Sequence, residues 1–317
     1  MFTNYLSAEF PSQINIDLSE FCNLKCIHCP YEQVTKIKGS TRENLDYEIH
    51  RKLINEISEN ENYCKYIRYT GEGEPLLHPR LLDILEYAKN NTKTTLTITT
   101  NGQLLTEKII TKILSYIDIF DISIDAFSEE TYEKIRVGGK FKIVKENVNN
   151  LIKHIKNKKL KNKTMVSFVE QEQNKNEASD FKSYWKNQGV DFVVIRSQHS
   201  CAGSIKKIKD KMWDNINKNN IKRKPCLYPW ERLMVTPRGM VTYCPADWLH
   251  EHTVGNLKKE TIKEIWKGKK MIDVRKFHES NNFPETSLCK TCPDWCNIKW
   301  PNEGRSYATV VHEFQDL

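Results

Sequence analysis

The sequence predicts an α/β fold built on a parallel sheet. Short runs rich in isoleucine, valine and threonine alternate with longer helical patterns, a rhythm typical of repeated strand–helix–strand units. Six strands are predicted, too few for a full eight-stranded barrel. The strand candidates are residues 14–18, 66–69, 95–99, 119–124, 165–169 and 192–195. The helix candidates include residues 46–58, 80–89, 106–115, 141–155 and 177–187.

The residues with the most distinctive side chains directly follow these strand candidates. Parallel α/β sheets bind their ligands at the carboxyl ends of the strands, where successive loops meet. The local pattern and the positions of the motifs therefore agree with each other, as expected of a sequence that specifies one fold.

Three cysteines in the loop after the first strand candidate are the strongest functional signal. Cys22, Cys26 and Cys29 are separated by three and then two residues, and thiolates are the ligands of iron–sulfur clusters. A cubane cluster has four irons, so three cysteines leave one iron open to chelation by a small molecule. The alternatives are a zinc knuckle or structural thiols. Zinc usually takes four protein ligands, and only His28 stands nearby.

This cysteine spacing resembles the signature of the radical S-adenosylmethionine (SAM) enzymes, and the resemblance covers roughly residues 12–200. It implies that SAM fills the open iron of a [4Fe-4S] cluster. Reductive cleavage of SAM then makes a 5′-deoxyadenosyl radical, which removes hydrogen from unactivated C–H bonds. The resemblance also implies a partial (β/α)6 TIM-like barrel and a flavodoxin or ferredoxin as electron donor.

The same resemblance assigns residues to SAM. The Gly-x-Gly-Glu-Pro loop after the second strand candidate is not a dinucleotide fingerprint, because Leu76 stands where a third glycine is needed. In the family this loop binds the methionine amino group, the next two strand ends contact the methionine carboxylate and the ribose, and an aromatic packs near adenine. The open alternative is that each residue is a loop polar group satisfied within the chain. The expected SAM-binding residues are His28, Gly71, Gly73, Glu74, Asn101, Ser123, Asp125 and Arg136.

The amino-acid composition of the chain changes after residue 204. Residues 1–204 are predicted to form the partial barrel, 205–225 a lysine- and asparagine-rich linker with a short helix, and 226–317 a smaller domain. The last part holds five of the ten cysteines. Apolar runs on both sides of a Pro-x-Gly turn predict a β-hairpin over residues 233–242, which would bring Cys226 and Cys244 together.

These later cysteines resemble those of the C-terminal iron–sulfur extension called SPASM, or of its shorter form, the twitch domain. The layout of Cys226, Cys244, Cys289 and Cys292 is close to that of the aminocyclitol dehydrogenase of butirosin biosynthesis. It implies one auxiliary [4Fe-4S] cluster, with Cys296 left over as an uncertain further ligand. Without the cysteine triplet upstream, zinc would be the favoured metal.

The composition indicates an ordinary globular protein, with 38% hydrophobic and 28% charged residues. A net charge of +8 comes mostly from lysine, and the basic residues at 153–163 predict a solvated helix face. Nucleic-acid binding is not favoured, because neither aromatic interleaving nor a known motif accompanies them. The start lacks a signal-peptide pattern, and no apolar stretch approaches the ~20 residues of a membrane span. Ten cysteines in this context indicate a cytoplasmic protein with metal-ligating thiols.

The leading functional hypothesis is a radical SAM dehydrogenase that oxidises a secondary alcohol of a sugar or cyclitol. Arg196 and His199, just after the sixth strand candidate, are candidate catalytic groups, and the histidine could act as a base. The alternative is a peptide-modifying enzyme, such as an epimerase, in which Cys201 or Cys296 donates hydrogen. About a dozen residues precede the first strand candidate, so a leader-binding module is not expected there. A non-catalytic iron–sulfur or zinc scaffold is the third hypothesis.

Overall fold

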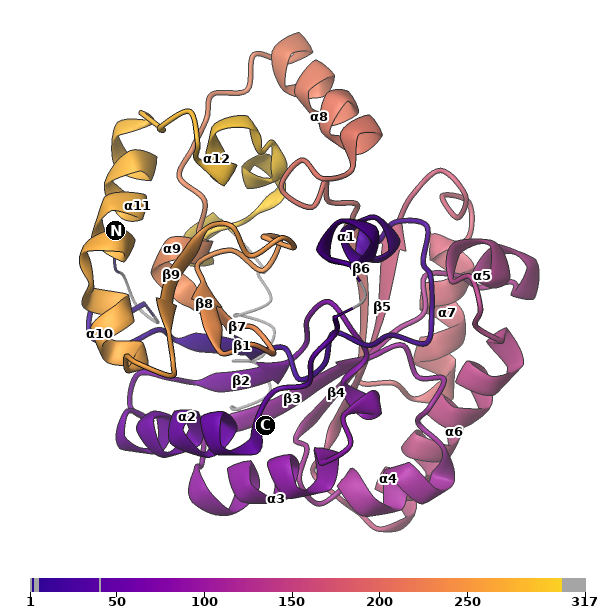
Figure 1. The fold of residues 1–317 in the computed structure, drawn as a ribbon. Coiled ribbons are helices and arrows are strands. Elements are labelled where there is room, and N and C mark those ends of the chain that lie inside the picture. Colours follow the sequence, from indigo (N-terminus) through magenta and orange to yellow (C-terminus); the bar gives the residue numbers. More distant parts are fainter. Residues whose placement is uncertain (1, 3–5, 40, 304–317) are drawn as a thin grey trace.

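A computed structural model describes the chain except residues 1, 3–5, 40 and 304–317. The described residues form one nine-stranded sheet, in the order β6-β5-β4-β3-β2-β1-β7-β8-β9 (Figure 1). Strands β1 to β6 pair in parallel, β7 continues the parallel part beside β1, and β8 and β9 are antiparallel. The largely parallel α/β fold expected from the sequence is confirmed.

All six predicted strands are present, with ends shifted by up to two residues. Strands β1 and β2 are buried along their whole length, although Gln13, Asn15 and Arg68 are polar or charged. The strands are β1 (Gln13–Ile16), β2 (Tyr66–Tyr69), β3 (Thr95–Thr100), β4 (Ile119–Ser123), β5 (Lys163–Glu170), β6 (Phe192–Ser197), β7 (Arg232–Val235), β8 (Met240–Thr242) and β9 (Thr253–Asn256).

Helices α2, α3, α4, α6 and α7 cover the outer side of the parallel strands (Figure 1). Helix α2 is typical: Asp46 caps its first turn by accepting from two backbone amides, and one face buries Leu53, Ile54 and Ile57 against the sheet. The five predicted helices are present, whereas α1 and α5 were not predicted. The helices of the barrel are α1 (Tyr31–Lys38), α2 (Tyr47–Glu59), α3 (Leu81–Asn91), α4 (Glu107–Ile113), α5 (Glu129–Ile135), α6 (Phe141–Asn157) and α7 (Ala178–Gln188).

The C-terminal part continues the sheet of the barrel. Strand β7 pairs in parallel with β1, and β7 and β8 form the predicted hairpin, with Gly239 at a φ of 75° in its turn. The predicted linker contains a helix of 13 residues, α8. The remaining helices are α8 (Lys206–Lys218), α9 (Tyr228–Glu231), α10 (Ile262–Lys267), α11 (Lys269–Ser280) and α12 (Leu288–Thr291).

The sheet is open between β6 and β7. Strand β6 is one edge of the sheet and is only partly buried, and a cavity lies between it and the start of β7. Within the described part of the chain, the helices are all too short or too polar to cross a membrane.

Candidate active site

The cysteine triplet lies in the loop between β1 and α1 and is held from two sides. The backbone amides of Lys25 and Ile27 donate to carbonyls of the segment that ends α5, each at 2.9 Å. From the other side, the amide of Glu74 donates to the carbonyl of Phe21 at 2.7 Å. Cys22, Cys26 and Cys29 thereby line one cavity of about 280 Å³ at the carboxyl ends of the parallel strands.

The donor set of this cavity fits an iron–sulfur cluster. Burial raises the pKa of Cys22 to about 11, and it also raises the pKa of Cys26 and Cys29. Such thiols ionise only when a cation replaces the lost water, and a cluster supplies that charge. In the described residues, no three histidine, cysteine, aspartate or glutamate side chains converge on a single metal ion. Cys22, Cys26 and Cys29 instead line a common cavity.

The glycines after β2 allow two loops of the chain to touch. A Cβ on Gly73 would lie 2.0 Å from the carbonyl oxygen of Ser19, and one on Gly71 would lie 2.0 Å from the side chain of Asp17. Burial beside Glu72 raises the pKa of Asp17 to about 8. Both glycines also line the cavity of the cysteine triplet, which we call the SAM-side cavity after the SAM site predicted there from the sequence. Because they lack side chains, this loop can lie directly against the cysteine loop.

Glu74 joins the end of β2 to the end of β3. Its buried carboxylate accepts from the Thr100 hydroxyl at 2.7 Å and from the Asn101 backbone amide at 2.9 Å. The amide side chain of Asn101 donates to Asn23 in the cysteine loop at 2.8 Å. Burial raises the pKa of Glu74, against the effect of these donors. Glu74 and Asn101 both line the cavity, and their roles toward SAM stay predictions.

Asp125 and Arg136 were both predicted to contact SAM, and the structure pairs them with each other. Asp125 is fully buried and accepts from Nε of Arg136 at 2.9 Å and from the amide of Val169 at 2.7 Å. Ser123, Arg136 and His28 line the cavity together with the candidates named above, whereas Asp125 is not among its lining residues. Burial lowers the pKa of His28 to about 4, with Arg136 adding to the effect and Asp125 opposing it.

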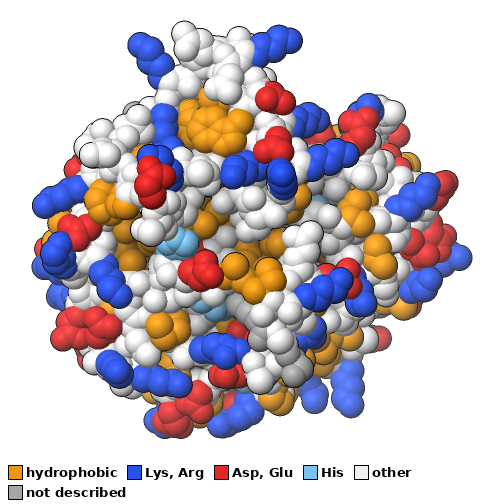
Figure 2. Space-filling view, turned by 45° about the horizontal axis from the view of Figure 1, so that its top comes forward, with side chains coloured by type: hydrophobic (Ala, Val, Ile, Leu, Met, Phe, Trp, Pro, Cys, Tyr) orange, Lys and Arg blue, Asp and Glu red, His pale blue; other side chains and the backbone are white. Residues whose placement is uncertain are grey.

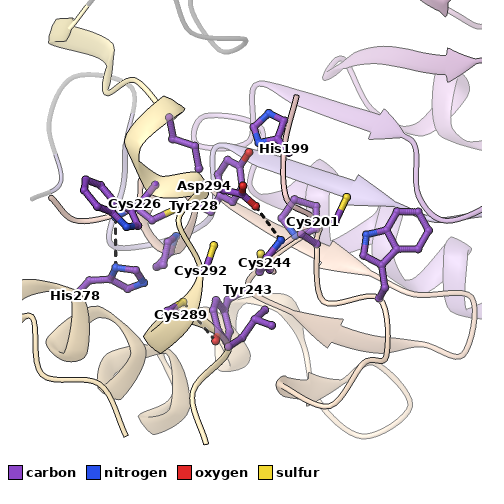
Figure 3. A pocket seen from close by; sticks show the side chains of 18 of the residues that line it. His199, Cys201, Cys226, Tyr228, Tyr243, Cys244, His278, Cys289, Cys292 and Asp294 are labelled. Carbon is purple, nitrogen blue, oxygen red and sulfur yellow. Dashed lines mark hydrogen bonds between the residues drawn. The ribbon is translucent and has the colours of Figure 1, made fainter. Parts of the chain in front are cut away.

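A second cavity, of about 230 Å³, lies between the barrel and α11 and α12 and holds the other cysteine set. Cys226 precedes α9, Cys244 follows β8, and Cys289 and Cys292 lie in and just after α12. Figure 3 shows their four sulfur atoms around one space, while the sulfur of Cys201 points away from them. The predicted convergence of these four residues is thus present in the structure, and a four-thiol donor set fits a fully ligated cluster.

Several polar side chains also line this second cavity. Nδ1 of His278 accepts from the backbone amide of Cys226 at 3.3 Å, and the thiol of Cys289 donates to the Tyr243 hydroxyl at 3.7 Å (Figure 3). Arg223 donates to the carbonyl of Cys289 and lines the same cavity. Its positive charge faces a set of thiols that would carry negative charge with iron bound, which favours the loaded state.

Cys296 lies apart from the other four. It lines a separate, outer cavity beside α8 and β6, and its thiol donates to the side chain of its neighbour Asn297 at 3.6 Å. The structure therefore does not bring Cys296, which was an uncertain ligand from the sequence, to the second cavity. The reason is the short helical turn over Asp294–Asn297, which carries Cys296 away after Cys292.

Three residues form a wall common to both cysteine-lined cavities: His199, Cys201 and Trp248. The loop with His199 and Cys201 is fixed by Asp294, whose carboxylate accepts from the amides of Ser200 at 2.7 Å and Ala202 at 2.8 Å. Burial lowers the pKa of His199 and raises that of Cys201 to about 12. Trp248 and Asp294 were missed from the sequence. The signal that could have found Asp294 is its place two residues after Cys292.

Arg196 lies inside the barrel rather than at the shared wall. Its Nη2 donates to Asp121 and to Ser167, each at 3.1 Å. Asp121 also accepts from Arg68 at 2.7 Å. Burial opposes ionisation of Asp121, but Arg196 and Arg68 outweigh it and lower the pKa of that carboxyl.

The geometry defines an iron–sulfur protein with two cysteine-lined sites, and the family comparison agrees. Residues 16–178, just over half of the chain, match the model of the radical SAM superfamily. The chain belongs to the radical SAM superfamily. Residues 226–293 match the SPASM iron–sulfur cluster-binding domain, so the resemblance predicted from the sequence is confirmed in both parts. The cofactors are SAM, its [4Fe-4S] cluster and auxiliary iron–sulfur.

Curated relatives share the first part of the chain. A probable GTP 3′,8-cyclase of Methanococcus maripaludis is 32% identical over 138 residues, 43% of this chain and 44% of the relative. A tungsten-containing aldehyde ferredoxin oxidoreductase cofactor-modifying protein of Pyrococcus furiosus is 25% identical over 186 residues, 57% of this chain and 49% of the relative. The chain spans about half the length of the curated relatives that it matches.

Solved structures share the fold over nearly the whole chain. BtrN in complex with AdoMet and 2-DOIA has a TM-score of 0.57 at 19% identity, over 92% of this chain and 94% of BtrN. Streptococcus suis SuiB bound to its precursor peptide SuiA has a TM-score of 0.64 at 15% identity, over 96% and 73%. Native anSMEcpe with bound AdoMet has a TM-score of 0.63 at 17% identity, over 96% of each chain. At these identities the likeness shows a common fold.

Proposed function

We propose that this protein is a radical SAM dehydrogenase that oxidises a secondary alcohol of a sugar or cyclitol. The observation that carries the proposal is the wall of His199, Cys201 and Trp248, which is common to the SAM-side cavity and to the four-cysteine cavity. A substrate at this wall is close both to a radical source and to an electron acceptor. The dehydrogenation of an alcohol needs both.

The electron balance explains why the second cluster matters. When bound, SAM with its cluster supplies a 5′-deoxyadenosyl radical, and the auxiliary cluster supplies a one-electron acceptor. Conversion of a carbinol to a ketone removes one hydrogen atom from carbon, one proton from oxygen and one electron. The hydrogen atom forms 5′-deoxyadenosine, the proton needs a base, and the electron needs the acceptor held by Cys226, Cys244, Cys289 and Cys292.

His199 is our candidate for the base. Burial lowers the pKa of its imidazole, so the ring is neutral near pH 7 and able to accept a proton. Asp294 holds the loop that carries His199, because its carboxylate accepts from the backbone amides of Ser200 and Ala202. Arg196 is a positioning candidate, because Asp121 and Ser167 already bind its guanidinium inside the barrel.

Peptide modification is the second candidate function. The thiol of Cys201 lies in the shared wall and points away from the four auxiliary cysteines, as a hydrogen donor to a substrate on the SAM side would need to (Figure 3). SuiB was solved with a precursor peptide and anSMEcpe with a peptide, and both share this fold. Cys296 is the weaker donor candidate, because it lines an outer cavity.

The experiment uses anaerobically reconstituted protein, a flavodoxin or dithionite as electron donor, and a panel of sugars and cyclitols in deuterated water. The proposal predicts 5′-deoxyadenosine and a product with a new carbonyl. It also predicts that Cys201→Ala keeps substantial product formation. Solvent deuterium at the reacting carbon, lost in Cys201→Ala, would overturn the dehydrogenase in favour of epimerisation.

A further inference from the structure

Three buried side-chain nitrogen atoms lie around the four-cysteine cavity. They are Nε of Arg223, Nε2 of His278 and Nε1 of Trp295, and all three residues line that cavity of about 230 Å³. Within the part of the chain that the structure describes, none of these three atoms has a hydrogen-bond partner. Buried polar groups without a partner are rare in folded proteins, because burial removes the water that would otherwise bind them. Three of them at one cavity therefore indicate that the group held there is their partner.

All three atoms are hydrogen-bond donors. Nδ1 of His278 accepts from the backbone amide of Cys226 at 3.3 Å (Figure 3), so the proton of this ring is on Nε2. The indole nitrogen of Trp295 and Nε of Arg223 can only donate. A metal ion cannot accept a hydrogen bond, whereas the sulfur atoms of an iron–sulfur cluster can. The three donors therefore fit the auxiliary cluster that the four cysteines would hold.

The donors come from three separate segments, and packing holds each of them. Arg223 follows α8, His278 lies on α11, and Trp295 lies in the short turn Asp294–Asn297. The guanidinium carbon of Arg223 lies 4.1 Å from the ring centre of Phe283, and the His278 ring centre lies 4.9 Å from it. His278 and Trp295 are 4% and 2% exposed, so neither side chain can turn to solvent without unpacking.

Tyr243 supplies a fourth donor once iron is bound. Its hydroxyl lies 3.7 Å from the sulfur of Cys289 (Figure 3). A thiolate that binds iron has lost its proton, so in the loaded protein the hydroxyl is the donor and the sulfur is the acceptor.

We infer that Arg223, His278, Trp295 and Tyr243 donate hydrogen bonds to sulfur atoms of the auxiliary cluster and thereby raise its reduction potential. Reduction adds one electron to the cluster, and donors stabilise the more negative state more strongly. In the proposed dehydrogenation, on which this consequence rests, the electron lost by the substrate passes to a cluster that these donors make a better acceptor.

The test is a redox titration of the anaerobic, iron-loaded protein without substrate, followed by electron paramagnetic resonance. Trp295→Phe keeps an aromatic ring and removes one N–H, and His278→Phe does the same on α11. In the signal that SAM leaves unaltered, each variant should shift the reduction equilibrium about tenfold toward the oxidised cluster, the effect of one charge-assisted hydrogen bond. For a one-electron couple this is a fall in potential of about 59 mV. The SAM-sensitive signal should keep the parent's potential.

Trp266→Phe is the matched control. Trp266 belongs to the same C-terminal part, but its Nε1 donates to the carbonyl of Ser7 at 3.0 Å, and the residue is not among those that line the cavity. This variant should leave both potentials unchanged. Parent-like potentials in iron-loaded Trp295→Phe and His278→Phe would overturn the inference.

A second measurement needs no variant and decides the matter if the variants fail to load iron. Arg223 is the arginine that lines the four-cysteine cavity. Pulsed electron paramagnetic resonance of the parent, with arginine isotopically labelled at the guanidinium nitrogens, should show a nitrogen coupling in the signal that SAM leaves unaltered. Absence of this coupling would overturn the inference.

The same preparations separate this inference from the proposed function, because the potentials are measured without a sugar or cyclitol. The expected shifts in potential without any carbonyl product overturn the proposed function alone. A carbonyl product with parent-like potentials in both donor variants overturns this inference alone.

Discussion

Arg136 lies between Asp125 and the cysteine loop: its Nε donates to the Asp125 carboxylate at 2.9 Å, and its Nη1 faces the sulfur of Cys26 at 3.8 Å. Asp125 adopts a φ of 65°, a left-handed backbone that a non-glycine residue takes only when its surroundings hold it there. The acid at the end of β4 thus orients a cation beside a predicted iron ligand. An arginine so placed offsets the negative charge of a thiolate-bound cluster.

Asp125→Asn should lower the free energy of unfolding by about 3 kcal/mol, because it leaves the buried guanidinium of Arg136 without its counter-charge. The measurement is anaerobic denaturant unfolding of the variant and the parent. Asp180→Asn, at an exposed position of α7, is the matched control and should change stability by less than about 0.5 kcal/mol. A similar stability of the two variants would show that the pair is not important for folding.

Glu74→Gln should weaken SAM binding about tenfold while leaving the iron content unchanged. The carboxylate accepts from Thr100 and from the Asn101 amide, and the NH₂ of glutamine cannot replace both acceptors. A buried ammonium group of SAM also needs an anionic or polar partner. Equilibrium dialysis with SAM measures the change, with the exposed Glu146→Gln as control. Unaltered SAM affinity in Glu74→Gln would refute the assignment of this loop.

The sequence predicted those parts of the site whose residues lie close together along the chain. The spacing of Cys22, Cys26 and Cys29 is contained in one loop, and a hairpin signal sufficed to bring Cys226 toward Cys244. The parallel strands were predicted well because each is a short β-branched run between turn residues.

Contacts between distant segments could not be predicted in this way. Asp294 and Ser200 are 94 residues apart, and no periodicity or turn chemistry links them. The parallel pairing of β7 with β1 is of the same kind. Arg136 was predicted from the sequence as a contact of the SAM carboxylate, which stays a prediction. Its pairing with Asp125 inside the protein was not predicted, because it depends on a backbone conformation that composition does not reveal.

Asp294→Asn should increase hydrogen exchange at the amides of Ser200 and Ala202. The carboxylate accepts from one amide with each oxygen, and asparagine keeps only one acceptor oxygen. Hydrogen exchange measured by mass spectrometry on the peptide that contains residues 198–204 reports the change, with the exposed Asp210→Asn as control. Unchanged protection would mean that Asp294 does not hold the shared wall.

Asp17 should make the protein less stable as pH rises from about 4 to 8. Burial beside Glu72 raises its folded-state pKa to about 8, so the folded protein retains a proton that the unfolded chain loses near pH 4. The stabilisation that protonated Asp17 provides is complete below the pKa of Asp17 in the unfolded chain, and it is lost as the pH rises through the pKa of Asp17 in the folded protein. The difference in unfolding free energy between the parent and Asp17→Asn should therefore change by up to about 1.4 kcal/mol per pH unit between pH 5 and 7. A constant difference would contradict the buried, protonated state.

The central claim, that two cysteine sets hold two different clusters and only one of them binds SAM, is tested most directly by electron paramagnetic resonance of the dithionite-reduced protein. The parent should contain about eight irons and show two signals, of which SAM changes one. A Cys22→Ala, Cys26→Ala, Cys29→Ala variant should retain half of the iron and a signal that SAM leaves unaltered. A SAM-sensitive signal in this variant, or stoichiometric zinc without iron in the anaerobically purified parent, would contradict the claim.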